Sequence, residues 1–397
     1  MADRRPYDLV LFGATGFTGA LTAEYLAAHA PDGCRWALAG RNRGKLEALR
    51  ERLGRPDLPL LDADSGDPGS LRAVAESARV VISTVGPYLR YGEPLVAACA
   101  EAGTDYVDLT GEPEFVDRMY VRHHRRAVET GARLVHACGF DSVPHDLGVL
   151  FTVRQLPGDA PVSVQGFVRA GGTFSGGTLA SALTVVSRPL AGARAARERR
   201  AAEPRPAGRR VRAAARPPRW SREARAWVLP LPTLDAQVVA RSAAALPAYG
   251  PDFRYAHYAA VKRLPIALAG VAGAGLAVLA AQLGPLRRGM SGLRKPGQGP
   301  GEAERAAAWF TVRFVAESGG RRVFTEVSGG DPGYTETAKM LAESALCLAF
   351  DQLPETAGQL TTAVAMGSAL IDRLTGAGLR FRVLDAAPAG PPGRVRA

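Results

Sequence analysis

The chain has 397 residues, which is long enough for two domains with a sizeable core, and its hydrophobic fraction of 47% is that of a soluble globular protein. The formal net charge of +12 is concentrated in one segment, residues 188–225, which holds thirteen arginines and three glutamates. Because no nucleic-acid-binding motif accompanies this charge, we exclude nucleic acid as a partner. We expect a solvated, partly mobile arginine-rich insertion. An anionic membrane or an acidic partner is the alternative interpretation.

The four cysteines lie far apart in the sequence, at positions 34, 99, 138 and 347, and have no paired spacing of the metal-binding kind. The chain also begins without a signal peptide. Both observations predict reduced thiols, no bound metal and a cytoplasmic location.

The first predicted strand, Asp8–Phe12, leads directly into a glycine loop, Gly13–Gly19, and then into a helical pattern that ends near Ala30. A strand, a glycine turn and a helix in this order are typical of dinucleotide binding, because glycines let the backbone approach the pyrophosphate at the positive end of the helix. The expected phosphate contacts are Gly13, Thr15, Gly16, Phe17, Thr18 and Gly19.

The second predicted strand, Trp36–Ala39, is followed by residues that select the cofactor. An NAD enzyme usually places a carboxylate here to bind the ribose 2′-hydroxyl. This chain instead offers Arg41, Asn42 and Lys45, with no carboxylate before Glu47. The pattern therefore predicts NADP(H), whose 2′-phosphate would meet a guanidinium.

Two further turns follow predicted strands. After the third strand, Leu58–Leu61, Asp64 is placed either to contact the adenine or to cap the next helix. The fourth strand, Val80–Thr84, is β-branched on both faces, as in a buried parallel sheet. Because ligands bind where such strands end, we expect its last residue and the turn after it to contact the nicotinamide half: Thr84, Val85, Gly86 and Pro87.

A fifth strand at Asp105–Asp108, a helix at Pro113–Thr130 and a sixth strand at Arg133–His136 complete the predicted sheet. The turn after it, 138–146, could cap a helix or touch the cofactor, and we expect Gly139 to be a cofactor contact. The fold class is therefore α/β, with a Rossmann-type doubly wound parallel sheet over residues 1–150.

At this point the chain resembles the saccharopine dehydrogenase-like oxidoreductases, and most of all their trans-acting enoyl reductase branch. The resemblance continues to the C-terminal part and is interrupted around the arginine-rich insertion. It implies an NADPH-dependent enoyl reductase acting on a lipid or polyketide-derived substrate, as in glycolipid biosynthesis. It rests on the segments GATGFTG, AGRN, STVGPYLRYGEPLVAACAEAGTDYVDLTGE, CGFDSVPHDLG, VVARSAAAL, PGQGP, SGGDPGYTETAKMLAESAL and AMGSALIDRL.

Residues 151–385 predict an α+β domain for substrate binding and, in a homodimer, for dimerisation, followed by a flexible tail, 386–397. Its elements include a strand at Val162–Arg169, a hairpin formed by Phe310–Glu317 and Arg321–Val327, helices at Tyr334–Leu353 and Thr361–Leu374, and a last strand at Leu379–Leu384. The resemblance implies that the last helices return to the Rossmann domain.

Residues 264–286 contain no charged side chain and are long enough to span a bilayer. Alanine and glycine dominate the stretch, so we expect a buried or membrane-surface helix, with a transmembrane span as the alternative. The predicted location is cytoplasmic, and at the periphery of the plasma membrane if this helix lies on the membrane surface.

Hydride transfer needs an acid for the accompanying proton. We predict Tyr88 and His145 as donors and Asp141 as an orienting group. The alternative is a core tyrosine, a helix-capping aspartate and a histidine on an ordinary helix face. Two other functions remain open: a saccharopine dehydrogenase-like imine or ketone reductase, and a non-catalytic NADP-binding, lipid-associated protein.

Overall fold

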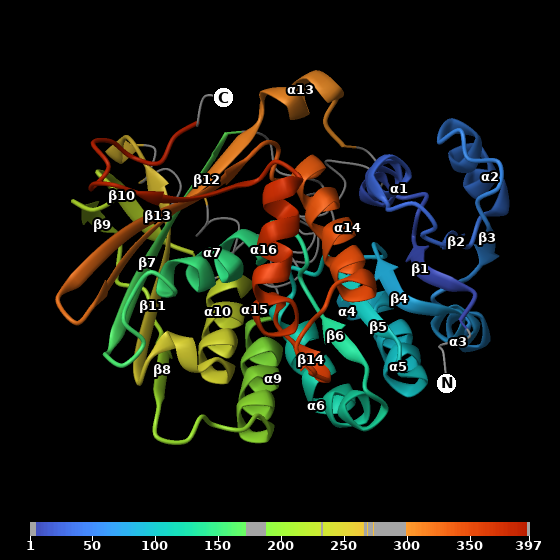
Figure 1. The fold of residues 1–397 in the computed structure, drawn as a ribbon, viewed down its shortest axis with the longest axis horizontal. Helices are drawn as coiled ribbons and strands as arrows, with labels where there is room; N and C mark the ends of the chain where they lie inside the picture. Colours follow the sequence, from blue (N-terminus) through green and yellow to red (C-terminus); the bar gives the residue numbers. More distant parts are fainter. Residues whose placement is uncertain are drawn as a thin grey trace.

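The computed structural model describes residues 5–171, 188–231, 233–265, 268, 273 and 299–394. In these parts of the chain two β-sheets stand side by side, with helices packed between them (Figure 1). One sheet is built mainly from the N-terminal third of the chain and the other from its middle and C-terminal parts. The architecture confirms the predicted α/β class with a second, mixed domain.

The first sheet has seven strands, all parallel, in the order β14-β6-β5-β4-β1-β2-β3. Strand β1 lies inside the sheet between β4 and β2, and the chain winds outward from it in both directions, as in a Rossmann-type sheet. The strands are β1 (Tyr7–Phe12), β2 (Trp36–Gly40), β3 (Leu60–Asp62), β4 (Ala78–Ser83), β5 (Asp105–Asp108), β6 (Arg133–Val135) and β14 (Gly358–Leu360).

Both faces of this sheet are buried, because alternate residues of each strand enter different cores. In β1, Leu9 and Leu11 join a core that also contains the helices between the sheets and the inner face of the second sheet. Val10 and Phe12 point the other way, into a core closed by α3, α5 and α6. The helices of this part are α1 (Phe17–His29), α2 (Arg43–Arg52), α3 (Pro68–Ser77), α4 (Tyr88–Tyr91), α5 (Glu93–Ala102) and α6 (Pro113–Thr130).

The second sheet has eight strands and contains both parallel and antiparallel pairs. The predicted hairpin is confirmed, and its turn residues Gly319 and Gly320 have φ values of 55° and 77°, which favour glycine. The strands are β7 (Val162–Gly171), β8 (Arg210–Ala213), β9 (Arg219–Ser221), β10 (Ala226–Pro230), β11 (Asp252–Val261), β12 (Trp309–Ser318), β13 (Arg321–Gly329) and β15 (Arg380–Leu384).

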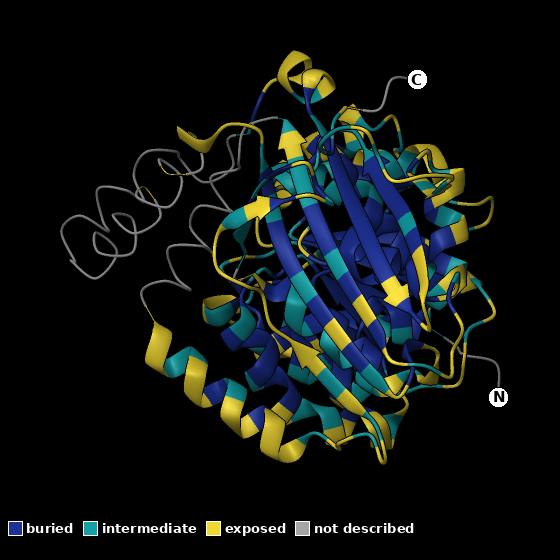
Figure 2. Cartoon of the chain, turned by 90° about the vertical axis from the view of Figure 1, so that its left-hand side faces the viewer, coloured by how far each residue is buried: buried dark blue, intermediate teal, exposed yellow. Residues whose placement is uncertain are grey.

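The outer face of the second sheet is covered in part by the C-terminal tail. Thr311 donates its hydroxyl proton to the carbonyl oxygen of Gly393 at 2.7 Å, and Arg313 binds the carbonyl of Gly390 at 2.7 Å. The central strands are therefore largely buried along their length (Figure 2). The tail, which we expected to be flexible, is tied to β12 over residues 390–393.

The helices between the sheets come from separate parts of the chain. Helix α14 packs against α1, β4 and β5, and β14 pairs with β6 through Leu360 and Val135. The single helix predicted for Thr361–Leu374 is wrong, because the chain breaks at Gly367, whose φ is 54°. The elements are α7 (Val143–Val153), α9 (Pro189–Ala202), α10 (Leu234–Ala245), η1 (Pro247–Tyr249), α13 (Glu302–Ala307), α14 (Thr335–Phe350), α15 (Thr362–Ala365) and α16 (Gly367–Gly376).

The arginine-rich insertion is more than a solvated segment. Helix α9 packs on α6, where the Arg199 guanidinium is buried and lies 2.6 Å from the Asp117 carboxylate. Arg188 binds Glu114 in the same way, at 2.8 Å. Buried carboxylates on α6 therefore fix this helix, a constraint that the arginine count alone does not reveal.

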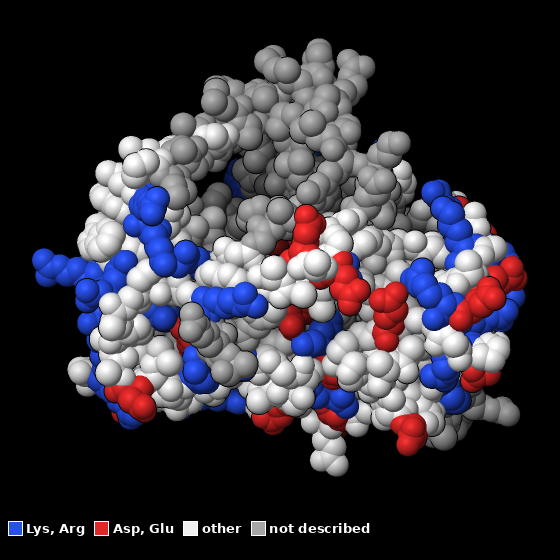
Figure 3. Space-filling model, turned by 90° about the horizontal axis from the view of Figure 1, so that it is seen from above, with Lys and Arg blue, Asp and Glu red and all other residues white. Residues whose placement is uncertain are grey.

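On the face seen from above, basic side chains are interspersed with acidic and neutral ones (Figure 3).

Within the described part of the chain, no helix combines the length and the apolar character that crossing a bilayer requires. The predicted apolar helix, 264–286, lies outside the described residues, except for positions 264, 265, 268 and 273.

All four cysteines are free, as predicted, and Cys34 is the only one of them that is not fully buried. Burial raises the pKa of the Cys34 thiol from 9.0 to about 11. At pH 8 we therefore expect Cys34 to react with Ellman's reagent about 100-fold more slowly than an ordinary thiol, because only the thiolate is nucleophilic. The same chain in guanidinium chloride should show four fast thiols. A fast native thiol would contradict the buried setting of Cys34.

Candidate active site

The glycine loop between β1 and α1 leaves no room for side chains at two positions. Gly13 has φ +86°, and a Cβ atom there would lie 2.6 Å from Val85 Cγ2. A Cβ on Gly19 would lie 2.3 Å from the Gly13 carbonyl oxygen. Gly16 stands at the N-cap of α1 with no side chain to cap it, so the first backbone N–H groups of the helix are open to an anion. The loop therefore has the cradle shape that a pyrophosphate needs.

The end of β4 supports this loop. The Thr84 hydroxyl donates a hydrogen bond to the Gly13 carbonyl at 3.0 Å and so holds the backbone of the glycine loop. Its direct contact with the nicotinamide half stays a prediction. Val85 touches the same glycine, and Gly86 and Pro87 lead into α4.

The remaining loop positions stand at the rim of the cradle. Thr15 is exposed, while Phe17 and Thr18 form the first turn of α1. The Phe17 ring packs edge-on against Tyr334 with the ring centroids 4.7 Å apart, and Gly299 lies directly against it. The second domain thus contacts the loop at Phe17.

After β2, the side chains of Arg41 and Lys45 are exposed, whereas those of Asn42 and Arg43 bind nearby backbone groups. Arg41 is exposed and has no ion-pair partner among the residues that the structure describes. Asn42 caps α2 by accepting a hydrogen bond from the Lys45 backbone N–H at 3.0 Å, and Lys45 is itself exposed. Arg43, by contrast, is held by the Leu60 carbonyl at 3.0 Å. Arg41 is therefore open to a ligand, and its contact with a 2′-phosphate stays a prediction.

Asp64 serves the turn that follows β3. Its carboxylate accepts a hydrogen bond from the Gly66 backbone N–H at 2.8 Å, and the residue is exposed. The helix cap that the sequence left open for Asp64 is made by Asp67, whose carboxylate accepts a hydrogen bond from the Gly69 backbone N–H at 3.0 Å at the N-cap of α3. The adenine contact stays a prediction.

Tyr88 lies apart from the other predicted catalytic residues. Its hydroxyl donates to the Ser83 carbonyl at 3.0 Å and accepts from the Leu109 N–H at 3.1 Å, inside the core of the first sheet. Burial raises the pKa of Tyr88 well above its ordinary value. With both hydrogen-bonding directions used by the backbone, the donor role that we predicted for Tyr88 has no support in this geometry.

Asp141 stands in the turn after β6, where the carboxyl ends of the strands meet. Gly139, earlier in the same turn, is packed against Leu109 and Thr337. A Cβ on Gly111, in the loop after β5, would lie 2.8 Å from the Asp141 carboxylate. Solvent still reaches Asp141, although surrounding protein atoms and then the charge of Asp235 raise its pKa to about 6.

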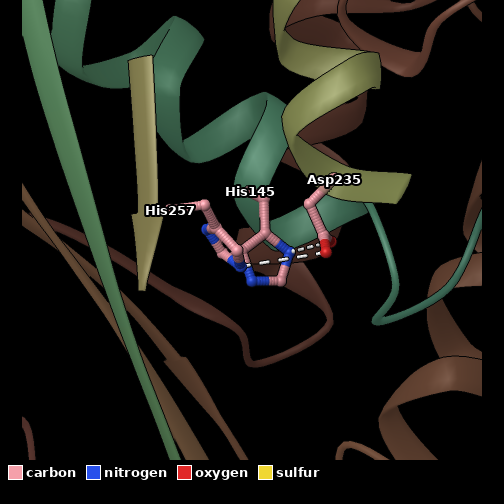
Figure 4. Close-up of side chains that lie close together, drawn as sticks. All are labelled: His145, Asp235 and His257. Atoms are coloured by element: carbon pink, nitrogen blue, oxygen red, sulfur yellow. Dashed lines mark ion pairs between the residues drawn. The ribbon is translucent and has the colours of Figure 1, made fainter. Parts of the chain in front are cut away.

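His145 follows on the first turn of α7 and meets two residues that the sequence analysis did not single out (Figure 4). Its Nδ1 lies 2.8 Å from Asp235 Oδ1, and the other carboxylate oxygen lies 3.8 Å from His257 Nε2. Asp235 comes from the first turn of α10 and His257 from β11. All three side chains are at most 4% exposed.

The charges within this cluster are unequal. Burial opposes the ionised form of Asp235, but the electrostatic effect of the neighbouring His145 and then of His257 lowers its pKa below the ordinary value. Burial, followed by the electrostatic effect of His145, lowers the pKa of His257 to about 3. At neutral pH, Asp235 is therefore ionised and His257 is neutral.

One signal could have identified His257 from the sequence. In β11 it follows Phe253 and Tyr255 at a spacing of two, on the face that enters the core, so it is a buried polar residue among aromatic ones. Asp235 offered no such signal, because an acidic residue in the first turn of a helix is common for electrostatic reasons alone.

Comparison with known proteins gives a consistent result for the first sheet. Residues 9–135 match the family described as the saccharopine dehydrogenase NADP binding domain. Among solved structures, the apo saccharopine dehydrogenase (L-Glu forming) of Saccharomyces cerevisiae covers 95% of this chain and 99% of its own, with a TM-score of 0.58 and 12% identity. At that identity the likeness shows the fold alone.

Relatives of known name cover nearly the whole chain. The trans-acting enoyl reductase of Mycobacterium tuberculosis strain H37Rv is 37% identical over 94% of this chain and 97% of its own. That of Mycobacterium ulcerans is 37% identical over 95% of this chain and 97% of its own. A further M. tuberculosis protein, provisionally named for the same activity, is 41% identical over 96% of this chain and 98% of its own.

Proposed function

Because this chain belongs to the trans-acting enoyl reductase family, with a saccharopine dehydrogenase-type NADP-binding domain, it is an NADP(H)-dependent oxidoreductase, and we propose that it reduces the conjugated double bond of a lipid or polyketide-derived acyl chain. The observation that carries this proposal is the meeting of three features at one end of the first sheet. They are the glycine cradle, the exposed Arg41 and the turn that carries Asp141 beside His145. When bound, NADPH would supply a hydride to the β-carbon of the substrate.

The protein has two tasks in such a reduction: to hold the cofactor and to deliver a proton to the α-carbon. The cradle and Arg41 provide for the first. For the second, we assign Asp141 and His145, which are supported by their place in and after the turn that follows β6. Contact of 264–286 with a membrane surface, and a homodimer, stay predictions.

A substrate panel tests the reaction class. The full chain with NADPH should reduce trans-2-enoyl thioesters of N-acetylcysteamine, with mass spectrometry showing a gain of two hydrogens and NADPH consumed in equal amount. Reduction of α-keto acids with amines, and not of the enoyl thioesters, would favour the imine reductase instead. NADPH binding without oxidation by any of these compounds would favour the non-catalytic protein.

Asp141 gives a pH-dependent prediction. Since its pKa is raised to about 6, the carboxyl is neutral below that pH and charged above it. We expect Asp141→Asn, a neutral isostere, to match wild-type kcat/KM below about pH 5 and to fall behind by roughly tenfold by pH 8, where only the wild type adds the charge of residue 141 to that of Asp235. Profiles from pH 4.5 to 8.5 for both proteins measure the difference. A ratio that stays constant with pH would refute the orienting role.

A further inference from the structure

The cluster of His145, Asp235 and His257 assembles side chains from three elements far apart in the chain, α7, α10 and β11. Asp235 bridges the two imidazoles with its two oxygens, and the rings of His145 and His257 are nearly perpendicular, with centroids 4.7 Å apart. On the far side of His257, its Nδ1 is hydrogen-bonded to the Tyr255 hydroxyl at 3.0 Å. The cluster is therefore closed on the side of the second sheet.

Only one of the two imidazoles is placed to balance the charge of Asp235. His257 remains neutral, since burial and then the electrostatic effect of the neighbouring His145 oppose its protonation. His145 is the nearer ring, with Nδ1 at 2.8 Å from the carboxylate. A carboxylate beside one ring nitrogen stabilises the imidazolium, in which the other nitrogen also carries a proton.

Within the described part of the chain, neither ring nitrogen of His145 makes a hydrogen bond of good geometry, nor does Asp235 Oδ1. Nδ1 and Oδ1 meet as a close ion pair at 2.8 Å, whereas the buried Nε2 has neither a hydrogen bond nor an ion pair there. Phe140 presents its ring edge-on to the same imidazole at a centroid distance of 5.5 Å. A buried N–H group without an acceptor costs free energy, and an acceptor that arrives with a ligand would remove that cost. Asp141 is exposed to solvent and stands four residues before His145, in the turn that leads into α7.

We propose that His145 donates the proton of the reduction from Nε2, that Asp235 and His257 position it, and that Asp141 connects it to solvent. This inference rests on the proposed function. The Nε2–H bond breaks as the electron pair of the substrate enolate forms a C–H bond at the α-carbon. The imidazole is left neutral beside Asp235 and regains its proton from water through Asp141. The groups that face His145 are Asp141 in its own turn, Asp235 on α10 and His257 on β11.

The protonation states can be measured without any substrate. In the full chain with NADP⁺ bound and ¹⁵N-labelled histidine, we expect a proton on Nε2 of His145, the atom that the proposal makes the donor, and a single ring proton on His257 from pH 5 to pH 8. Asp235→Asn should remove the proton from His145 Nε2. The matched control is His136→Gln, which alters another buried histidine–aspartate pair, with Nδ1 at 2.7 Å from Asp108, and should leave the His145 signals unchanged.

Three results would overturn the proposal. The first is a His145 Nε2 that carries no proton in the wild type, and the second is an Nε2 proton that Asp235→Asn does not affect. The third is one equivalent of zinc in the purified chain that His257→Gln removes, because the three side chains are also metal-ligand types whose donor atoms lie within 4.8 Å of one another. The last result would replace a proton donor by a metal site.

Kinetics with a trans-2-enoyl thioester complete the test. A general acid contributes about 10²–10⁴-fold, so His145→Gln and Asp235→Asn should lower kcat at least about 100-fold while the Kd for NADPH stays within about twofold. His257→Gln should lower kcat less and shift the pH profile, whereas His136→Gln should leave that profile unchanged. If the wild type reduces no enoyl thioester, the proposed reaction fails, and the ¹⁵N spectra still decide the state of His145.

Discussion

Replacement of Gly19 by alanine is expected to abolish measurable NADPH binding in the micromolar range. The new Cβ would lie 2.3 Å from the Gly13 carbonyl oxygen and 3.0 Å from Ala14 Cα, both backbone atoms that cannot turn away. The loop must therefore shift, and its N–H groups shift with it. Losing two hydrogen bonds to a charged phosphate, at about 1.5–3 kcal/mol each, raises the Kd about 100-fold or more.

Nucleotide titration followed by fluorescence measures this effect, and thermal unfolding shows whether the fold survives. Overpacking of this kind costs about 1–3 kcal/mol, so a folded protein of lower Tm is expected. Gly192→Ala is the matched control, because its Cβ in α9 would meet nothing within 4 Å. That variant should bind NADPH normally and be slightly more stable. Wild-type affinity in Gly19→Ala would show that the loop does not hold the pyrophosphate.

Removal of the Arg41 side chain is expected to weaken NADPH binding by about 10–100-fold and to leave NADH binding unchanged. The guanidinium is exposed and, in the part of the chain that the structure describes, has no competing carboxylate. Its contact with the 2′-phosphate would be a charge-assisted hydrogen bond worth about 1.5–3 kcal/mol. NADH lacks this phosphate, so the variant should lose most of the preference between the two cofactors.

Arg43→Ala provides the comparison. This neighbouring arginine is already engaged by the Leu60 carbonyl at 3.0 Å and by Glu47 at 3.4 Å, so its loss should change the two Kd values little. If Arg43→Ala instead removed the preference while Arg41→Ala kept it, the phosphate site would lie on the other side of the turn.

Local chemistry made the cofactor half predictable from the sequence. The cradle at Gly13 and Gly19 depends on residues adjacent in the chain, and Arg41 directly follows the strand that positions it. Asp64 and Asn42 show the limit of such reasoning, because aspartate and asparagine side chains bind the N–H groups of a neighbouring turn or helix end as readily as a ligand.

The catalytic half depended on contacts that the sequence does not display. Tyr88 was chosen for its chemistry and its place near a strand end, yet its hydroxyl is engaged by two backbone groups. Asp235 and His257 reach His145 only because α10 and β11 pack against α7, an arrangement decided by tertiary structure. The break at Gly367 is also hard to see in the sequence, because the helical spacing of apolar residues continues across it. Glycine can adopt the φ of 54° observed there, and this allows α16 to start in a new direction.

The strand β14 has a consequence for how this protein is made. Its pairing with β6 and the packing of α14 on α1 mean that the cofactor-binding half includes residues from near the end of the chain. While the ribosome is still synthesising the middle of the protein, the edge of β6 has no neighbour and the β4–β5 surface beneath α14 is open to water. The first sheet is therefore incomplete until residues 358–360 have been synthesised, and the nascent chain carries an exposed strand edge until then.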